Sequence, residues 1–569
     1  MPLFRSGRIW LVWSLIGLVF LLIGAPLFGL LLGAFTDTPP GVAPRFSLDA
    51  LAYAYGAAQH LQSLGNSLAF AFCTATLVLL LGGALAWAAA RTDSLLRHFG
   101  DVFVLVPIFI PAVLFVAGWI LLLGPSNGLV NLFLVAGLNL SGSPFDIYSF
   151  SGMVWVAVLQ ELPLAFLWLW PTFRAMNPSL EEAAMVAGAS TGMIIRRISL
   201  PLLRPTLLSA WIIFFIYSLG ALAVPLMIGL PSRIILYSTE VYLAAHRVPG
   251  DLNLASAFSL LFLAVTVAGV FLYRRMTSDA DRFVTITGKA FSPRIVRLGR
   301  WRALVDLLAV ATLFLTAGLP IMVLVWNAFL PFPQAPSRQA FDLLTLKNFS
   351  DALSYGPAIR AVVNSLWIGL AAGVVTTLLG AAIAWTVVRY QRPRLALALL
   401  DQMATLTIAT PGMIVGVSLL WFYLLVPLPI YGTPWLLLIA YITLHLPYAV
   451  RICVSGLSQL HKELEEAGWI AGAGWSRIAL RIVLPLIGAS LLTSVLYVTL
   501  RAFREYAASI FLAGPGTEVF SVLVLDLWDG GQFNLLSAYV TLVVAVLAAV
   551  VAVFSWLTRR FSLKLASSK

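Results

Sequence analysis

Long apolar runs, separated by short polar segments, occupy almost the whole of this 569-residue chain. A run of about 20 apolar residues has the length of a membrane-spanning helix. The runs lack the alternating segments of about ten residues that build a membrane β-barrel. The pattern therefore predicts an all-α polytopic membrane protein with about 12 transmembrane helices. The predicted spans are residues 9–34, 66–89, 101–124, 151–173, 205–230, 253–273, 303–330, 364–388, 399–426, 434–457, 486–512 and 535–558.

One polar motif occurs twice, 284 positions apart, which is half of the chain length. In each copy a Glu-Ala-Ala or Glu-Ala-Gly triplet is followed by a glycine after three residues and by Ile-x-Leu-Pro after nine more. The chain is therefore duplicated, and since each half has an even number of spans, the two halves have parallel topology. We expect a first repeat at 1–275, a basic cytoplasmic linker at 276–302 and a second repeat at 303–569. The two copies of the motif begin at Glu182 and Glu466, contain Gly188 and Gly472, and end at Pro201 and Pro485.

Shorter landmarks support the duplication. An Asn-Ser-Leu triplet opens the second span of each repeat, and a Leu-Pro pair recurs in the fourth span at the same 284-residue offset. Pro111 and Pro411 lie inside the matching third spans, where they predict kinked helices whose freed carbonyls are satisfied by neighbouring helices or water. These landmarks are Asn66 and Asn364, Pro163 and Pro447, and Pro111 and Pro411.

Composition and charge agree with a membrane protein. Hydrophobic residues make up 61% of the chain and charged residues only 10%, whereas a soluble domain carries roughly a quarter charged residues. The net charge of +12 does not indicate a nucleic acid partner, because 27 of the 35 lysines and arginines fall in loops on one side of the predicted membrane. This bias places both termini in the cytoplasm, and we expect a multi-pass protein of the bacterial inner membrane. The segment 274–302 holds eight of these residues; it either sets the orientation or binds anionic lipid.

Residues 178–201 and 460–485, which contain the motif, are too polar to span a membrane and lie on the basic side. Ser179 with Glu182 resembles a capping box, and acidic residues in a first helical turn favour the positive end of the helix dipole. The glycine that follows permits a sharp turn, and proline ends a second amphipathic run before the fifth span. We therefore predict a helix–turn–helix on the cytoplasmic face of each repeat, exposed to a partner protein.

The motif resembles the EAA signature of permease subunits of binding-protein-dependent ABC importers. Both copies match at full spacing, and the only departure is Gly468 in place of the second alanine. The resemblance covers nearly the whole chain, which looks like the fused permeases of the ferric-iron importer class. Three further sequence motifs, one in the linker and two near the end of the eleventh span, support that class. They are Thr287-Gly288-Lys289, Phe503-Arg504-Glu505-Tyr506-Ala507-Ala508-Ser509 and Gly514-Pro515-Gly516.

The resemblance implies a type I ABC importer permease fold in which each EAA segment docks on an ATP-binding cassette subunit. The sequence contains no G-x-x-x-x-G-K-[ST] phosphate loop, so ATP and Mg²⁺ are expected on separate subunits, in two copies. We expect no enzyme activity and no bound cofactor in this chain; a periplasmic substrate-binding protein and membrane lipid are its other expected partners. By motif position the coupling residues are Glu181, Glu182, Ala183, Ala184, Gly188, Glu465, Glu466, Ala467, Gly468 and Gly472.

Charged side chains inside spans are costly and mark a transport pathway or a structural pair. Arg501 and Glu505 are spaced i,i+4, so they are expected either to pair within one helix or to leave Glu505 facing a central cavity. In the second case Glu505 and Tyr506 would offer hard oxygen groups to a ferric or other cationic cargo. Glu161 and His445 lie 284 positions apart, and they either line a gate near the pseudo-twofold axis or make polar contacts within the bundle. The candidates along the substrate path are Glu161, His445, Arg501, Arg504, Glu505 and Tyr506.

Two outer segments, 231–252 and 513–534, are rich in aromatic and acidic residues. We expect surface helices there, which either receive a loaded binding protein or anchor the chain at the membrane interface. Two other classes of function stay open: an ion-gradient-driven secondary transporter, which would need no EAA segments, and a membrane scaffold without transport. Ferric iron leads as the cargo by resemblance, and thiamine, phosphonate and other small solutes are the alternatives.

Overall fold

The computed structural model describes residues 3–100, 107, 110–176, 179–278, 295–390, 392–426 and 428–549. Within these ranges the chain is almost entirely helical, and its β-structure is limited to two isolated bridges, which confirms the predicted all-α class. The elements of the first half are α1 (Leu3–Val19), η1 (Phe20–Gly24), α2 (Ala25–Ala34), α3 (Asp49–Gly56), α4 (Ala58–Arg91), α6 (Ala112–Leu123), α7 (Leu129–Leu138), α8 (Phe150–Ala175), α9 (Ser179–Val186), α10 (Thr191–Ile194), η2 (Ile195–Ser199), α11 (Leu200–Leu219), η3 (Pro225–Gly229), α12 (Tyr237–His246) and α13 (Leu252–Ser278). Those of the second half are η5 (Gly299–Trp301), α14 (Arg302–Leu313), η6 (Phe314–Gly318), α15 (Leu319–Ala328), α16 (Arg338–Asp342), α17 (Lys347–Ser354), α18 (Gly356–Arg389), α19 (Arg394–Thr405), η7 (Leu406–Ala409), α20 (Gly412–Leu425), α21 (Pro434–Ser458), α22 (Glu463–Ile470), α23 (Trp475–Ile478), η8 (Ala479–Val483), α24 (Leu484–Leu486), α25 (Gly488–Phe503), α26 (Ser509–Leu512) and α27 (Phe520–Asp529).

The helices account for the predicted membrane spans. Eight helices of the described chain are long and apolar enough to cross a membrane, and a ninth crossing is a helix pair bent by 75° between Ser476 and Phe503. Shorter apolar helices at Ala112–Leu123, Gly412–Leu425 and Phe533–Ala549 coincide with the three remaining predicted spans. The structure thus agrees with a polytopic all-α membrane protein.

Some predictions fall outside the described residues. They include most of the linker 276–302 with its Thr287-Gly288-Lys289 text, Pro178 at the start of the first EAA segment, and the ends of the third and twelfth spans (101–106 and 550–558). The proposed limits of the linker and of the two repeats therefore stay predictions.

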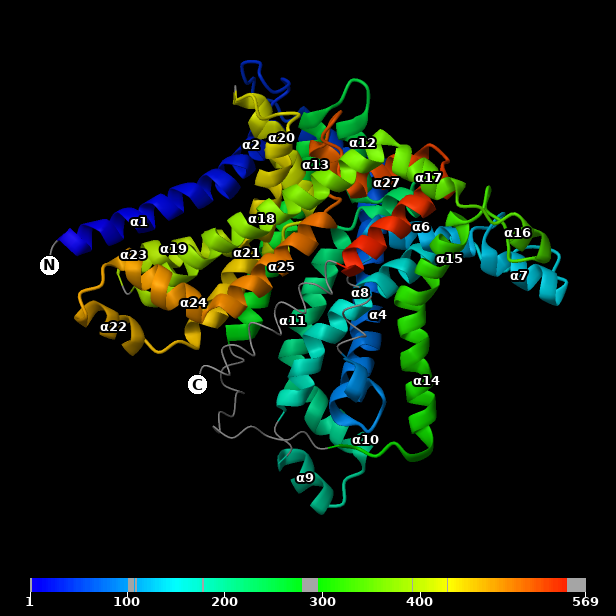
Figure 1. The fold of residues 1–569 in the computed structure, drawn as a ribbon, viewed down its shortest axis with the longest axis horizontal. Coiled ribbons are helices and arrows are strands. Elements are labelled where there is room, and N and C mark those ends of the chain that lie inside the picture. Colours follow the sequence, from blue (N-terminus) through cyan, green and yellow to red (C-terminus); the bar gives the residue numbers. More distant parts are fainter. Residues whose placement is uncertain are drawn as a thin grey trace.

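The second span is the centre of packing in each repeat. α4 packs along α8 and α11, and α18 packs in the same way along α21 and α25 (Figure 1). Gly82 of α4 lies against Ala165 of α8, and the equivalent Gly380 of α18 lies against Ala449 of α21. Because a glycine has no side chain, the two helices approach closely at both contacts. Equivalent helices therefore make equivalent contacts, as a duplicated sequence requires.

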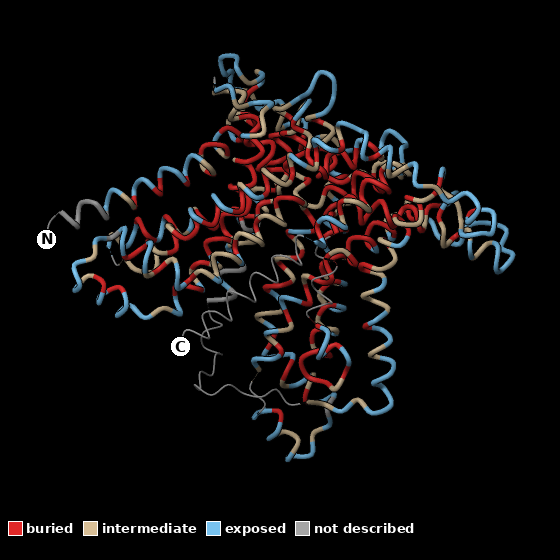
Figure 2. The backbone as a smooth tube through the Cα atoms, viewed as in Figure 1, coloured by how far each residue is buried: buried red, intermediate tan, exposed pale blue. Residues whose placement is uncertain are grey.

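The first span of each repeat packs on the third span of the other repeat. α1 and α2 lie along α19 and α20, and α15 lies along α6. A side chain at Gly33 in α2 would collide with Trp421 of α20, and one at Gly118 in α6 would press on Pro320 of α15. The repeats are therefore interlocked. The largest of the three hydrophobic clusters in the described chain draws on both repeats, and Figure 2 shows the buried residues concentrated in the upper part of the molecule.

Three predicted spans are broken near the centre of the molecule. α11 ends at Leu219 and α25 ends at Phe503, before the predicted ends at residues 230 and 512, and η7 divides the predicted span 399–426. Pro111 and Pro411 do not kink a helix as predicted; they are the N-cap residues of α6 and α20. Proline is tolerated there because the start of a helix does not need its missing N–H group.

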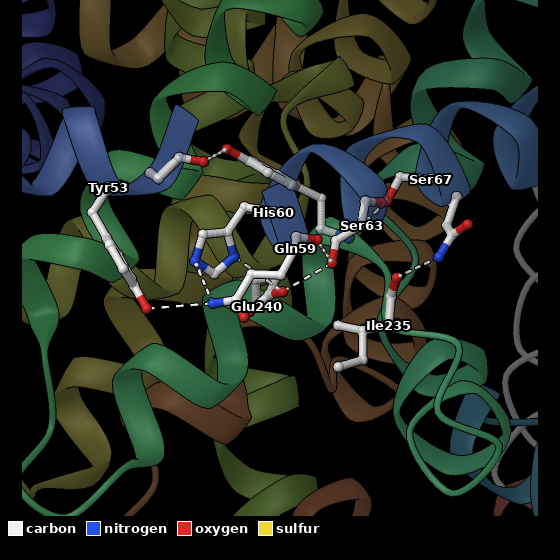
Figure 3. Close-up of polar contacts among 10 residues, drawn as sticks. Tyr53, Gln59, His60, Ser63, Ser67, Ile235 and Glu240 are labelled. Carbon is white, nitrogen blue, oxygen red and sulfur yellow. Dashed lines mark hydrogen bonds and ion pairs between the residues drawn. The ribbon is translucent and has the colours of Figure 1, made fainter. Parts of the chain in front are cut away.

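The Asn-Ser-Leu triplets hold the outer helices α12 and α27 in place. Ser67 Oγ accepts a hydrogen bond from the Tyr237 N–H at 2.6 Å, and Ser365 Oγ accepts one from the Phe520 N–H at 2.7 Å. The preceding asparagines donate to carbonyl oxygens just before the same helices. Figure 3 shows the first of these contacts, at Ser67 and Ile235. The repeated triplet thus satisfies backbone groups that the start of a helix leaves unpaired.

The prediction that these outer segments form surface helices is wrong in part, because most residues of α12 and α27 are buried. Glu240 is only 6% exposed; it accepts a hydrogen bond from Ser63 and lies 3.2 Å from His60 Nδ1 (Figure 3). These partners make burial of the carboxylate possible, and the sequence pattern did not reveal them. Asp526 and Asp529 do reach the surface, and partial burial together with neighbouring acids raises the pKa of Asp526.

The two EAA segments lie at separate extremities of the molecule. In Figure 1, α9 is at the lower end of the first bundle and α22 is at the left end of the second. The outer helices α12 and α27 and the spans α13 and α20 converge in the upper part, where Figure 2 shows much of the buried chain. The spans therefore diverge from the outer helices toward the EAA segments.

Candidate functional site

Each EAA segment is a short helix followed by a glycine turn and a second, irregular helix that leads into the fifth span. In the first segment α9 ends at Val186, and Gly188 has a φ of +84°. In the second α22 ends at Ile470, and Gly472 has a φ of +76°. L-residues other than glycine rarely adopt such left-handed angles. The predicted helix–turn–helix is confirmed in both repeats.

The first acidic residue of each segment is buried in an ion pair with the second span. Glu181 Oε2 lies 2.7 Å from Arg91 at the end of α4, and its other oxygen accepts a hydrogen bond from Ser199 Oγ at 2.7 Å. Glu465 Oε1 lies 2.6 Å from Arg389 at the end of α18. Both acids are 8% exposed. These two pairs fix each EAA helix to the second span of its own repeat.

The sequence analysis did not predict these two arginines as partners of the EAA segments, although their repeated spacing indicated such a role. Arg91 and Arg389 each follow the asparagine of the Asn-Ser-Leu triplet by 25 positions and end the same long apolar helix. A charged residue repeated at an equivalent position needs an equivalent partner. The acid before the EAA triplet was the candidate partner in each repeat.

The other predicted coupling residues divide into an exposed and a covered group. Glu182, Ala183 and Gly188 are exposed, and so are Glu466, Ala467 and Gly472, whereas Ala184 is half-buried and Gly468 is buried. A Cβ added to Gly468 would lie 2.9 Å from Ile482 Cδ1. The departure from the EAA pattern therefore lies on the face of α22 that packs inward.

Each EAA helix also exposes two large apolar side chains that the motif does not include. In the first segment Leu180 is 52% exposed and Val186 is 91% exposed. In the second, Leu464 is 47% exposed and Ile470 is 87% exposed, at positions that are again 284 residues away. Exposed apolar groups of this kind mark surfaces that a partner covers. We call these four residues the apolar pairs of the EAA helices.

A cavity of about 190 Å³ lies between the two repeats. In the first repeat its walls come from the start of α6, from α8, and from α11 with the chain that follows it. In the second repeat they come from η7 and the start of α20, from α21, and from the end of α25 with the chain that follows it. Tyr217 and Arg501, both in its wall, are related by the 284-residue offset, so the cavity lies where equivalent parts of the repeats meet. The structure brings all six predicted path residues together in its lining, namely Glu161, His445, Arg501, Arg504, Glu505 and Tyr506.

Both carboxylates of the cavity accept hydrogen bonds from the protein. Glu161 accepts from Ser218 Oγ, at 3.1 Å and 3.0 Å to its two oxygens. Glu505 accepts from the Ala508 N–H at 3.1 Å. The alternative in which Glu505 pairs with Arg501 on one helix is not borne out, because α25 ends at Phe503 and the i,i+4 geometry is lost.

The cavity is rich in hydrogen-bond donors. The guanidinium of Arg501 lies 5.6 Å from the centroid of the Tyr448 ring, and Arg504 Nη2 donates to the Ile110 carbonyl at 2.7 Å. His445 is 2% exposed, and neither of its ring nitrogens has a hydrogen-bond partner among the described residues. The alternative of a satisfied polar contact thus holds for Glu161 and is wrong for His445.

Metal ligands are not clustered in the described part of the chain. No group of three or more His, Cys, Asp or Glu side chains lies close enough there to hold one metal ion. Cys73 and Cys453 are free, and each lies inside a long helix.

A family model and two curated relatives indicate the same protein family for this chain. Residues 377–567 match the model of "Binding-protein-dependent transport system inner membrane component". The chain is 26% identical to the ferric transport system permease protein FbpB of Actinobacillus pleuropneumoniae, over 96% of this chain and 77% of the relative. It is 31% identical to the putative ferric transport system permease-like protein AfuB of Escherichia coli, over 17% of this chain and 82% of the relative. Half of the chain (49%) aligns with the whole of one chain from a bacterial ABC transporter that imports alginate, at a TM-score of 0.38 and 20% identity. The chain belongs to the family of inner membrane components of binding-protein-dependent transport systems.

Proposed function

We propose that this chain is the fused permease of an ABC importer for ferric iron. The observation that carries the proposal is the combination of two equivalent EAA helices, each with an exposed apolar pair, and one polar cavity between the repeats. The choice of ferric iron is supported by the name of the relative that aligns with 96% of the chain.

The coupling residues are proposed to dock on separate ATP-binding cassette subunits, one for each EAA helix. Glu182, Ala183, Glu466 and Ala467 form the exposed part of this surface, together with the apolar pairs. The buried acids Glu181 and Glu465 connect it to the second spans. ATP and Mg²⁺ are proposed to bind to those subunits and not to this chain.

Transport is proposed to follow from relative movement of the EAA segments. These segments are far apart in Figure 1, whereas α12, α13 and α20 pack on one another in its upper part. Binding of ATP by the two subunits would draw α9 and α22 toward each other and open the cavity to the outer side. A periplasmic binding protein would deliver the cargo there, and hydrolysis would return the chain to the arrangement seen here. Both termini lie in the cytoplasm in this proposal, as the distribution of basic residues requires.

The test is uptake of radiolabelled ferric iron in a strain that lacks this chain. We expect uptake to be lost in the deletion strain and restored by the wild-type chain, but not by a variant with Val186→Asp and Ile470→Asp. Unchanged ferric uptake in the deletion strain would exclude iron as the cargo. Labelled thiamine and phosphonate, measured in the same cells, would then identify the alternatives.

The secondary-transporter alternative predicts a different energy source. The full complex is reconstituted in proteoliposomes with the ATPase subunits inside. Our proposal requires uptake to continue when ion gradients are collapsed and to stop when internal ATP is removed. Uptake that follows the gradient and ignores ATP would favour the secondary transporter instead.

A further inference from the structure

The lining of the cavity contains a cationic side chain, Arg501. Arg501 comes from the end of α25 and lies among the phenol rings of Tyr217, Tyr448 and Tyr497. Among the described residues it forms no ion pair with a carboxylate. A charged side chain inside a membrane protein is costly unless it is paired. An arginine in this position is therefore suited to bind an anion that enters the cavity.

Neither carboxylate of the lining forms an ion pair with Arg501 among the described residues, although Glu505 is near enough to interact with its charge. Glu161 is held by Ser218, and Glu505 is held by the backbone that follows it. Their oxygens are thus oriented by donors of the protein. In the cavity lining, the ring nitrogens of His445 and the hydroxyl of Tyr506 are buried and have no hydrogen-bond partner among the described residues. Tyr506 is 5% exposed and His445 is 2% exposed.

These unpartnered groups complement an oxyanion. A neutral imidazole supplies one N–H donor and a phenol supplies one O–H donor, and a guanidinium binds carboxylates and phosphates in a bidentate manner. Buried polar groups normally have partners, so those of His445 and Tyr506 indicate a ligand that supplies the missing acceptors. In the part of the chain that the structure describes, no three acidic or histidine side chains lie close enough together to hold a bare ferric ion.

We propose that the cavity holds its cargo through a small oxyanion, a carboxylate or phosphate group, which Arg501 binds and which His445 and Tyr506 hydrogen-bond. This inference rests on the proposed import of ferric iron, which would then cross the membrane as a complex with such an anion. The first repeat contributes Tyr217 at the position equivalent to Arg501 and Leu222 at the position equivalent to Tyr506. The anion site is therefore asymmetric and belongs mainly to the second repeat.

The test is transport by the complete complex in proteoliposomes, with the iron and its anion carrying separate labels. Ferric iron is supplied to the binding protein with labelled citrate in one arm and with labelled phosphate in the other. We expect iron and one of the two anions to accumulate together. Arg501→Gln should lower the accumulation of both labels at least about tenfold, because a hydrogen bond to a charged group is lost, whereas Arg501→Lys should retain part of it. Arg302→Gln, which changes an arginine that is 53% exposed and distant from the cavity lining, should transport as the wild type does.

A second, more conservative variant tests the anion site even if Arg501→Gln fails to fold. Tyr506→Phe removes only the unpartnered hydroxyl, and we expect it to lower accumulation of the anion by about threefold or more. Iron uptake without either anion, at wild-type rates in Arg501→Gln, would overturn the anion site and leave iron import intact. Accumulation of labelled phosphate or citrate that depends on Arg501, with no iron uptake, would instead support the anion site and reject iron as the cargo.

Discussion

Glu181 and Glu182 are neighbours in the sequence but have opposite surroundings. Glu181 is buried against Arg91 and Ser199, whereas Glu182 is exposed. The second repeat has the same arrangement at Glu465 and Glu466. One residue of each acidic pair therefore holds the EAA helix to its own bundle, and the other is available to a partner. The motif alone does not separate these two roles, because it gives the positions of the residues in the sequence and not the orientation of their side chains.

Removal of the buried acid should destabilise the permease. Glu181→Ala leaves Arg91 as a buried, unpaired charge, which typically costs about 3 kcal/mol. Thermal unfolding of the purified permease in detergent should show a lower midpoint for Glu181→Ala and for Glu465→Ala. The matched controls are Glu182→Ala and Glu466→Ala, which should unfold as the wild type does but bind the ATPase subunit more weakly. Equal unfolding midpoints for all four variants would contradict the assigned roles.

Substitution of the turn glycines should impair the permease because of their backbone conformation. Gly188 and Gly472 have open space around them, so an added methyl group meets no atom, but their positive φ angles cost an L-residue about 1–2 kcal/mol. We expect Gly188→Ala and Gly472→Ala to lower transport-coupled ATP hydrolysis severalfold while the chain still reaches the membrane. Gly192→Ala and Gly474→Ala are controls in the same segments, with equally open space and no positive φ. Similar losses in the controls would show that the turn angle is not the cause.

At the scale of elements, the hydrophobic pattern predicts which segments are helices better than where they break. The apolar text continues past Leu219, yet α11 ends there, because the next residue, Gly220, lies against Pro411 of the other repeat. No local signal announces a contact between residues so far apart in the sequence. The same limit explains why the Arg501–Glu505 alternative was wrong. The amino-acid sequence around Phe503 did not indicate that α25 ends there.

Repeated landmarks were the more reliable guide to the site. Glu161 and His445 were singled out only because they share an offset of 284, and both line the cavity. Two segments that occupy equivalent places in a duplicated fold meet at the axis that relates the repeats. The bonding state of each side chain could not be predicted in this way, because Ser218 binds Glu161 from a different helix.

The apolar pairs of the EAA helices should be the docking surface. A charge at these positions would be desolvated when the ATPase subunit covers them, which is unfavourable. Val186→Asp and Ile470→Asp should therefore abolish co-purification of the ATPase subunit while leaving the unfolding midpoint of the permease unchanged. Leu346→Asp is the matched control, because Leu346 is 68% exposed but lies before α17 and not in an EAA segment. Co-purification of the double variant at wild-type yield would place the docking surface elsewhere.

The outer helices should loosen when their serine contacts are removed. Ser67→Ala leaves the buried Tyr237 N–H without its acceptor, and Ser365→Ala does the same to Phe520; such a loss costs about 1–3 kcal/mol. Amide hydrogen exchange should become faster at the start of α12 in the first variant and at the start of α27 in the second. Ser354→Ala, which removes an exposed serine, should change exchange at neither helix. Unchanged exchange in the first two variants would mean that packing alone holds these helices.

At the scale of the whole molecule, the repeats are equivalent where the EAA segments attach and different where they line the cavity. The Arg91–Glu181 and Arg389–Glu465 pairs are the same contact made twice. In the cavity, by contrast, the second repeat supplies the charged Arg501 where the first supplies Tyr217. Crossed packing of the first and third spans joins the repeats, so a movement at either EAA segment acts on both sides of the cavity. Movements of two equivalent EAA segments can therefore act on one asymmetric cavity.

This arrangement predicts that the distance between the EAA segments depends on nucleotide. Met193 and Arg477 are equivalent, exposed residues on α10 and α23, outside the proposed docking surface, and these two helices lie far apart in Figure 1. In a background with Cys73→Ala and Cys453→Ala, the variant with Met193→Cys and Arg477→Cys should not react with a short bifunctional maleimide in the nucleotide-free complex. ATP with vanadate should trap the closed state and produce the intramolecular cross-link, visible as a change in gel mobility. The single-cysteine variants should give no such product. Because the spans converge at the end opposite the EAA segments, closure at the EAA segments requires the bundles to pivot there. Cross-linking of equal yield with and without nucleotide would rule that movement out.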